Sequence, residues 1–336
     1  MKKIIISCGG TGGHFYPGLA MARENIADGG DSLLLLSGIH AAKQAQNARQ
    51  NGVKAVELPY MPSPGKNPAR LLKFFIGLLT GFFRAKIEII KFKPDEIWGM
   101  GSFAQLPVIA AHGNIPVFLH DGNARIGKAN RFLSFMAQSV ATAFPAVNAD
   151  KCKAPVICIG MPLRQELKEH ARISKAEAIE KLNEEFGVEF SPGKTCYLIV
   201  GGSQGAATLN TNIPQALKQI KNPDFQVMHL AGPNKLDDVK AAYQDAEFPV
   251  LAIASSEKMQ LFYGAADRVF SRSGGSTVAE LILFRKKAVL VPYPYAAEDH
   301  QADNARYMVS LGNAVMVRDE EFTAEKVLAL LQENPA

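Results

Sequence analysis

The stretch SCGGTGGHFYPGLAMARE, residues 7–24, places four glycines, a threonine and a histidine between two ordinary segments. The preceding KKIIIS has the apolar run of a buried strand, and from Pro17 the segment LAMAREN has the composition of a helix. A strand–glycine–helix turn exposes backbone N–H groups at a helix N-terminus, where an anion binds well. The stretch therefore predicts an anion-binding turn at the start of an α/β domain.

Strand-like runs alternate with helical stretches, such as SKAEAIEKLNEEFG and STVAELILF, along the whole chain. This alternation predicts parallel sheets of the doubly wound kind. The runs form two series, each beginning with its own glycine-rich turn, so we expect two Rossmann-like domains, residues 1–160 and 161–336, joined near CIGMPLRQEL (158–167). The expected strands are 4–7, 33–38, 55–58, 96–100, 116–120 and 140–144, then 196–202, 226–232, 250–254, 268–274, 288–293 and 314–317.

Two more glycine turns, GGSQGA (201–206) and SGGST (273–277), follow strands in the second series. Dinucleotide binding is the first alternative, but the sequence does not match its pattern G-x-G-x-x-G, because Phe15 occupies the position of the third glycine. The acidic residue expected after the second strand is also missing from LLLLSGIH. The P-loop pattern G-x-x-x-x-G-K-[ST] is absent from the sequence. A single such loop could merely shape a turn, whereas three in matching positions favour phosphate binding.

The composition of the chain limits the kinds of protein that it can be. The chain has 336 residues, 47% hydrophobic and 21% charged, which is typical of a globular protein of about two domains. Its four cysteines show no C-x-x-C spacing, which argues against a metal site and suits a reducing cytoplasm. The run MKKIII is unlike a signal peptide, and no uncharged apolar run is long enough to span a bilayer. Residues 1–160 hold 18 Lys and Arg against 9 Asp and Glu, so this half should prefer an anionic partner.

Six motifs in order carry a resemblance: GGTGGHFYPGLA, LHDGNARIGKANR, GMPLR, GGSQGA, SRSGGSTVAEL and DHQADNA. Together they resemble the MurG family, the UDP-N-acetylglucosamine transferases of peptidoglycan synthesis, over nearly the whole chain. The resemblance implies a GT-B glycosyltransferase with two Rossmann-like domains facing across a cleft. It implies a hexosyltransferase that moves GlcNAc from UDP-GlcNAc to the C4 hydroxyl of MurNAc in lipid I (undecaprenyl-pyrophosphoryl-MurNAc-pentapeptide), giving lipid II by an inverting single displacement.

Sugar transfer must stabilise the leaving diphosphate and remove a proton from the acceptor hydroxyl. Many such enzymes use a metal held by Asp-x-Asp, which this sequence lacks, so we expect no metal and no cofactor, with helix N-termini in that role. The resemblance assigns the donor to the second domain, with Glu280 accepting the ribose hydroxyls, His300 and Gln301 contacting the transferred sugar, and Met259 near the base. The other implied donor residues are Arg164, Ser203, Gln204, Gly205, Ser273, Gly274, Gly275, Ser276 and Thr277.

We expect Glu280 to project from the first turn of its helix, where the structural alternative to ribose binding is a charge that interacts favourably with the helix dipole. For Met259, it is a core methionine. For His14, it is a histidine that merely hydrogen-bonds the loop. Within their motifs, we favour the functional interpretations.

The resemblance assigns the acceptor to the first domain. His14, at the helix entrance, is the candidate general base for the C4 hydroxyl. The glycines let the backbone approach the acceptor diphosphate. The implied acceptor residues are Gly10, Thr11, Gly12, Gly13, His120 and Asn123, of which Thr11, Gly12, Gly13 and Asn123 are also placed beside the donor.

The chain departs from the family pattern on the acceptor side. His120-Asp121-Gly122-Asn123 stands where the family usually has His-Glu-Gln-Asn, and Phe103 replaces a tyrosine. These changes leave open a related transferase that glycosylates diacylglycerol. A nucleotide-binding protein without transferase activity is the alternative from another class. The family also continues for a helix or two beyond TAEKVLALLQENPA, so we expect looser interdomain closure here.

Residues 67–93, NPARLLKFFIGLLTGFFRAKIEIIKFK, combine a short apolar block with flanking basic residues. Such a block is too short to span and suits an interfacial anchor on an anionic membrane, whereas the bland alternative is a buried helix. We expect peripheral binding at the cytoplasmic face of the cell membrane, where the family docks its polyprenyl-linked substrate. We expect no nucleic-acid partner, because this cluster lacks a polar reading surface and no recognised binding motif is present. The candidate membrane residues are Lys73, Phe74, Phe75, Leu78, Leu79, Phe82, Phe83 and Arg84.

Overall fold

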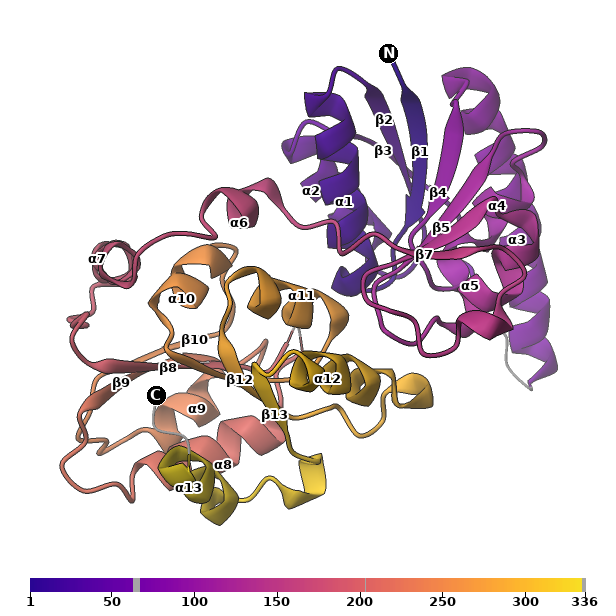
Figure 1. The fold of residues 1–336 in the computed structure, drawn as a ribbon. Coiled ribbons are helices and arrows are strands. Elements are labelled where there is room, and N and C mark those ends of the chain that lie inside the picture. Colours follow the sequence, from indigo (N-terminus) through magenta and orange to yellow (C-terminus); the bar gives the residue numbers. More distant parts are fainter. Residues whose placement is uncertain (63–66, 203, 334–336) are drawn as a thin grey trace. The chain divides into compact units, whose positions relative to one another are not determined.

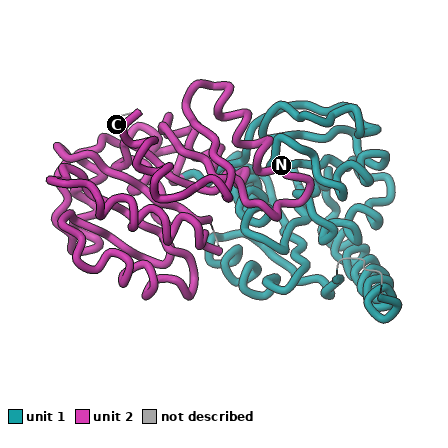
Figure 2. The backbone as a smooth tube through the Cα atoms, turned by 90° about the horizontal axis from the view of Figure 1, so that it is seen from below, with its two compact units in different colours: residues 1–165 teal, residues 166–336 magenta. Residues whose placement is uncertain are grey.

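A computed structural model describes residues 1–62, 67–202 and 204–333. The chain divides into two compact units, residues 1–165 and 166–336 (Figure 2). The division falls a few residues after the boundary expected from the sequence, within the same connecting segment. Each unit contains one parallel sheet with helices on both faces (Figure 1). The predicted α/β class is thus confirmed.

The sheet of unit 1 has the strand order β3-β2-β1-β4-β5-β6-β7 in the described part of the chain. Every pair of neighbours is parallel, and the order reverses beside β1, which is the switch point where open α/β sheets bind ligands. The strands are β1 (Lys3–Cys8), β2 (Asp31–Leu36), β3 (Lys54–Glu57), β4 (Glu96–Gly99), β5 (Val117–Asp121), β6 (Ser139–Thr142) and β7 (Val156–Cys158).

The sheet of unit 2 repeats this plan with the order β10-β9-β8-β11-β12-β13 among the described residues. Here the order reverses beside β8, so the glycine turn after β8 lies at the corresponding switch point. The strands are β8 (Thr195–Val200), β9 (Phe225–Leu230), β10 (Val250–Ile253), β11 (Arg268–Ser271), β12 (Lys287–Leu290) and β13 (Ala314–Met316).

Helices cover both faces of each sheet (Figure 1). In unit 1, α1 and α2 lie on one face and α3, α4 and α5 on the other. The helices are α1 (Gly12–Ala27), α2 (Ala41–Gln50), α3 (Pro68–Phe92), α4 (Leu106–Ala110), α5 (Lys128–Leu133), α6 (Gln165–Glu169), α7 (Lys175–Phe186), α8 (Ala207–Leu217), α9 (Leu236–Ala242), α10 (Met259–Ala265), α11 (Gly275–Leu283), α12 (His300–Ser310) and α13 (Ala324–Glu333).

The alternation of side chains along the strands divides the core of unit 1 into two layers. Ile5 and Leu35 point toward α3, where they pack with Ile89, whereas Ile4 and Leu34 pack on the opposite face beneath α1 and α2. Both faces are covered, so the central strands are apolar along nearly their whole length. This explains why the sequence shows continuous apolar runs for these strands.

Two expectations need correction. The first helix begins at Gly12, with Thr11 as its N-cap, and Pro17 lies inside it instead of starting it. Pro17 is the sixth residue of the helix, so it removes one backbone hydrogen bond from the second turn and crowds the carbonyl of Gly13. Strand β7 at the sheet edge was not among the expected strands, because its residues lie within the stretch taken as the connection between the two domains.

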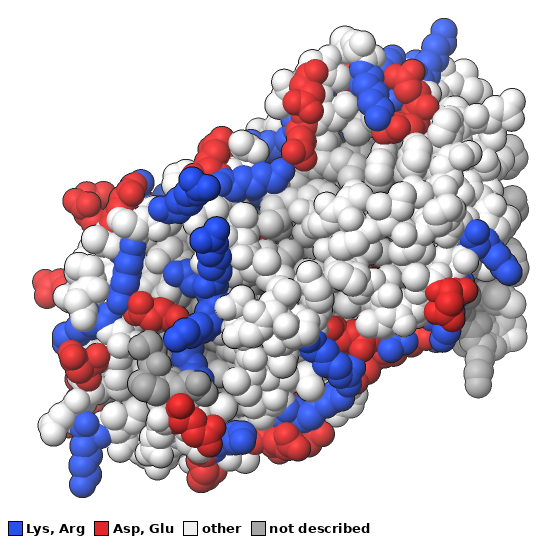
Figure 3. Space-filling model, in the orientation of Figure 1, with Lys and Arg blue, Asp and Glu red and all other residues white. Residues whose placement is uncertain are grey.

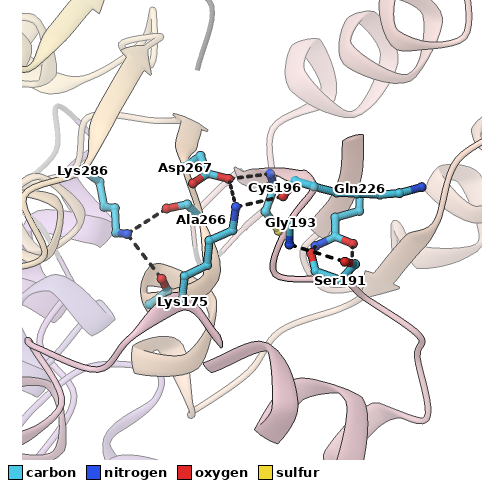
Figure 4. Close-up of polar contacts among 10 residues, drawn as sticks. Lys175, Ser191, Gly193, Cys196, Gln226, Ala266, Asp267 and Lys286 are labelled. Atoms are coloured by element: carbon cyan, nitrogen blue, oxygen red, sulfur yellow. Dashed lines mark hydrogen bonds and ion pairs between the residues drawn. The ribbon is translucent and has the colours of Figure 1, made fainter. Parts of the chain in front are cut away.

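A polar cluster ties α7 to the sheet of unit 2 at the ends of the strands remote from the glycine turns (Figure 4). The Lys175 ammonium forms an ion pair with Asp267, whose Oδ2 also accepts a 2.7 Å hydrogen bond from the Cys196 backbone N–H. Lys286 donates to the carbonyl oxygen of Ala266 at 2.7 Å, and burial lowers the pKa of its ammonium. These contacts anchor the start of unit 2.

Candidate donor and acceptor sites

The glycine turn between β1 and α1 packs tightly against the end of β2. Gly9 has φ +135°, and a Cβ there would lie 2.2 Å from the carbonyl oxygen of Ser37. Only glycine tolerates both this conformation and this approach. The turn therefore brings the backbone of residues 10–13 to the switch point with no side chain between, and the first N–H groups of α1 point out of the turn.

His14 is the third residue of α1 and is half-buried. Its Nδ1 lies 3.1 Å from the Thr11 hydroxyl oxygen, and its backbone N–H donates to the Thr11 carbonyl at 3.2 Å. The ring lies against the backbone of Gly101, where an added Cβ would come within 2.9 Å of Cδ2 and 3.1 Å of Nε2. Thr11 and Gly101 thus set the orientation of the imidazole.

Asn123 is held by Asp121, the last residue of β5. One carboxylate oxygen of Asp121 accepts from the backbone N–H of Asn123 at 3.1 Å and from its side-chain amide at 3.3 Å. The other oxygen accepts from the Gly127 N–H at 2.8 Å and from Asn130 at 3.0 Å. Asp121, which shortens the glutamate of the family pattern, therefore organises the whole loop that carries Asn123.

A buried amide pair extends this network to the Gly101 loop. Gln105 donates from Nε2 to Asn130 Oδ1 at 2.6 Å and accepts from the Gly101 N–H at 2.9 Å. Sequence reasoning missed Gln105 and Asn130, because residues 25 apart pair only once the fold is formed. Through them, the loop after β5 and the loop beside His14 are held as one piece.

His120 lies differently from the expectation that it contacts the acceptor. Its side chain is 1% exposed, and Nε2 lies 3.0 Å from the carbonyl oxygen of Gly160. Burial is the largest influence on its pKa and lowers it, although the Gly160 hydrogen bond and the charge of Asp121 oppose that effect. His120 therefore supports the loop from within unit 1 and does not offer its ring to a ligand.

Arg164 belongs to unit 1, near its C-terminal end. Its guanidinium lies over the ring of Tyr16 on α1, with Cζ 5.6 Å from the ring centroid. Such a cation–π contact restrains a long flexible side chain near the first glycine turn.

The turn after β8 in unit 2 carries the second predicted motif. The Gly205 N–H donates to the Gly202 carbonyl at 3.0 Å, and the Gln204 side chain is exposed. Helix α8 starts directly after this turn, so its N-terminal N–H groups lie at the end of the sheet. Ser203 lies outside the described residues.

The turn after β11 carries the third motif. Ser273 is buried and donates from Oγ to the Gln301 carbonyl at 2.8 Å, while Asn304 donates to the Ser273 carbonyl at 3.0 Å. Gly274 is the N-cap of α11, and the first turn of that helix contains Gly275, Ser276 and Thr277, all partly exposed. Ser273 is thus a structural residue of the turn, whereas the three helical residues present their N–H groups at its mouth.

Glu280 is the sixth residue of α11, so the expectation that it projects from the first turn is wrong. The helix begins at Gly275, two residues before Thr277, so Glu280 lies in its second turn. Because the dipole effect fades beyond the first turn, the interpretation of Glu280 as a dipole-satisfying charge loses its support. Its Oε2 accepts a 2.8 Å hydrogen bond from the hydroxyl of Tyr263, a residue that sequence reasoning did not select.

The remaining donor candidates occupy different environments. His300 and Gln301 begin α12 and are partly exposed; His300 Nδ1 lies 2.9 Å from the Ala297 carbonyl, and Gln301 Oε1 accepts from the Tyr293 N–H at 2.9 Å. Met259, in contrast, is buried at the start of α10, which agrees with the core alternative and not with contact to a base.

Helix α3 exposes a continuous apolar stripe along one side. Successive members stand three or four residues apart, so they lie on one helical face. The α3 stripe consists of Leu72, Ile76, Leu79, Phe83, Ile87 and Ile90. Lys73, Phe75 and Arg84 are also exposed, and Arg84 pairs with Glu88 at 3.1 Å.

Not all expected membrane residues belong to this surface. Phe74 is buried, so its assignment was wrong, and Leu78 and Phe82 are only partly exposed. The buried face of α3 contains Gly77, Gly81 and Ala85, whose small size lets the helix approach its neighbours. No helix in the described ranges is long and apolar enough to cross a membrane.

The charge excess of unit 1 is not spread over all of its surface. On the face seen in Figure 3, most of unit 1 is white, and acidic and basic side chains alternate over unit 2. No group of three or more His, Cys, Asp or Glu side chains arranged to hold a metal ion occurs among the described residues.

Comparison with known proteins agrees with this geometry. Residues 4–142 match the glycosyltransferase family 28 N-terminal domain, and residues 196–334 match the glycosyltransferase family 28 C-terminal domain. A crystal structure of Acinetobacter baumannii MurG superposes with a TM-score of 0.76 at 27% identity, covering 99% of this chain and 90% of that one. Fold and matches together define a two-domain glycosyltransferase of the GT-B type.

Full-length relatives narrow the class. Proteins named UDP-N-acetylglucosamine--N-acetylmuramyl-(pentapeptide) pyrophosphoryl-undecaprenol N-acetylglucosamine transferase are 34% identical in Protochlamydia amoebophila and in Nitrosospira multiformis. The alignments cover 98% of this chain and 87% and 88% of those proteins. The chain belongs to this family, the MurG transferases, and the resemblance drawn from its motifs is confirmed.

Proposed function

We propose that this protein transfers GlcNAc from UDP-GlcNAc to the C4 hydroxyl of MurNAc in lipid I, giving lipid II for peptidoglycan synthesis. The observation that carries the proposal is the near full-length relationship to transferases named for this reaction. Support comes from glycine turns that end in helix N-termini at the switch point of each sheet. Such turns suit the diphosphates of the donor and the acceptor.

In this proposal the acceptor binds to unit 1 and His14 is the general base. The C4 hydroxyl gives its proton to His14 and attacks the anomeric carbon, while the bond to UDP breaks and UDP leaves with the electron pair, inverting the configuration. His14 can accept this proton at Nε2 when Nδ1–H donates to the Thr11 hydroxyl oxygen 3.1 Å away. Asn123, oriented by Asp121, is the second acceptor contact.

The donor binds to unit 2. The first N–H groups of α11, with Gly274, Ser276 and Thr277, would neutralise the charge that develops on the leaving diphosphate. Glu280 would accept the ribose hydroxyls, and Gln204, His300 and Gln301 would contact the nucleotide and sugar. Because these groups supply the electrostatic stabilisation, we propose that transfer needs no metal ion.

The acceptor carries a polyprenyl chain, so the enzyme has to work at a membrane. The α3 stripe, flanked by Lys73 and Arg84, fits a peripheral contact with an anionic bilayer. We propose that this contact places the protein on the cytoplasmic face of the cell membrane, where the nucleotide sugar is available.

The test is UDP release from UDP-GlcNAc by the purified full chain with a short-chain lipid I analogue, in EDTA and with no added metal. Release with this acceptor, and none with diacylglycerol, is the expected result. Release only with diacylglycerol would overturn the acceptor assignment but keep the donor site. Absence of release in EDTA that returns with Mg²⁺ would overturn the metal-independent step.

A further inference from the structure

The proposed ribose-binding carboxylate is tied to a buried side chain on another helix. The Tyr263 hydroxyl of α10 donates to Glu280 Oε2 of α11 at 2.8 Å. Tyr263 is only 1% exposed, whereas Glu280 is partly exposed. The hydrogen bond thus runs from the interior of unit 2 out to a carboxylate that a ligand can reach.

The tyrosine is held rigidly. Its ring packs on Phe284, with centroids 5.4 Å apart, and α10 lies close against the segment before α7. A Cβ at Gly264, the next residue, would come within 2.5 Å of the Ile173 side chain, so α10 packs closely against its neighbours at this point. The Tyr263 hydroxyl is therefore a fixed donor rather than a mobile one.

We propose that Tyr263 is a positioning residue for ribose recognition, fixing the Glu280 carboxylate in the orientation that accepts both ribose hydroxyls. This inference rests on the proposed function, in which Glu280 binds the ribose of UDP. A glutamate has three rotatable bonds, and holding them in one geometry costs entropy that a pre-formed hydrogen bond removes before the ligand arrives. A carboxylate has about four acceptor positions, so one tyrosine bond orients it without saturating it.

The alternative is a purely structural role, in which the hydrogen bond to Glu280 only satisfies the buried Tyr263 hydroxyl. The two roles differ in what they discriminate. Loss of a structural bond weakens binding of every uridine nucleotide alike, whereas loss of carboxylate orientation weakens only binding that uses the ribose hydroxyls. The ratio of the dissociation constants for 2′-deoxy-UDP and UDP therefore separates them.

The experiment measures both dissociation constants by calorimetry on the full chain. Wild type should bind UDP more tightly than 2′-deoxy-UDP, and Tyr263→Phe should reduce that preference about fivefold. An equal loss for both nucleotides, or an unchanged preference, would overturn the inference. Tyr243→Phe is the matched control, because its buried hydroxyl bonds His229 Nδ1 at 3.0 Å instead, and its preference should remain that of wild type.

Glu280→Gln separates the inference from the proposed function. If this variant keeps the full preference for UDP, the ribose role of Glu280 fails. If it loses the preference while Tyr263→Phe retains it, only the positioning role fails. Should Tyr263→Phe not fold, Phe284→Leu loosens the packing of the Tyr263 ring and leaves Glu280 intact. A reduced preference for UDP over 2′-deoxy-UDP in that variant would support the inference, and the full wild-type preference would overturn it.

Discussion

The Thr11 hydroxyl oxygen and His14 Nδ1 lie 3.1 Å apart across the first turn of α1. The N-cap residue thus uses its side chain on the histidine and makes no side-chain capping bond to the helix backbone. Threonine at this position usually caps such N–H groups, and leaving them uncapped keeps them available to an anion. One residue therefore orients the proposed base and leaves the anion site open.

Substitutions of these two residues should lower kcat by different amounts. His14→Ala should lower kcat by about a thousandfold because it removes the base, and Thr11→Val by about tenfold because it only frees the ring. UDP affinity, measured by calorimetry, should stay near that of wild type in His14→Ala. A His14→Ala enzyme with unchanged turnover would refute the assignment of the base.

Gly101→Ala should lower kcat while leaving UDP affinity unchanged. The new methyl group would lie 2.9 Å from His14 Cδ2, so the imidazole would have to move. Gly113→Ala is the control, since it also has positive φ but faces only the flexible end of Lys86. Equal losses of kcat in the two variants would mean that backbone strain, and not the histidine, causes the effect.

The α3 stripe should determine binding to anionic vesicles. Phe83 is 61% exposed, and Phe83→Glu would add a negative charge and remove apolar area from the stripe. Binding of this variant to phosphatidylglycerol vesicles, measured by co-sedimentation, should be about tenfold weaker than that of wild type. Ile39→Glu, at a 75% exposed position outside α3, should bind as wild type does. Equal binding by wild type and Phe83→Glu would argue against this surface.

The ion pair between Lys175 and Asp267 should stabilise unit 2. Asp267→Asn removes the partner of the ammonium and weakens the bond from the Cys196 N–H, so the free energy of unfolding in urea should fall by about 1–2 kcal/mol. Glu177→Gln breaks the more exposed pair with Lys181 and should cost at most about 0.5 kcal/mol. A smaller effect for Asp267→Asn than for Glu177→Gln would contradict the anchoring role.

His229 should make stability depend on pH. Burial lowers its pKa from 6.5 to about 3, so between these values the unfolded chain binds a proton that the folded chain does not. The free energy of unfolding therefore decreases as the pH falls through this window, by up to about 1.4 kcal/mol per pH unit. Urea unfolding from pH 7 to pH 5 should show a shallower dependence for His229→Gln; an identical slope would rule out this proton uptake.

Much of the fold follows from the local pattern of residues. Apolar runs such as IIIS and LLLLSG predicted buried strands. Helices cover both faces of a parallel sheet, so its central strands have apolar residues at successive positions instead of alternating polar and apolar ones. The glycine turns were also recognisable, since a close backbone approach requires residues without side chains. Only β7 among the described strands was missed.

Tertiary structure alone decided which side chains meet. Helix α3 carries apolar side chains on two of its faces. Its small residues Gly77 and Gly81, by approaching Tyr60 and Pro107 closely, determine that Phe74 is buried and Phe83 exposed. Tyr263 and Glu280 lie 17 residues apart on separate helices and meet only because both helices pack on one sheet. Periodicity gives the order of elements along the chain, whereas side-chain contacts between elements depend on packing that no local pattern encodes.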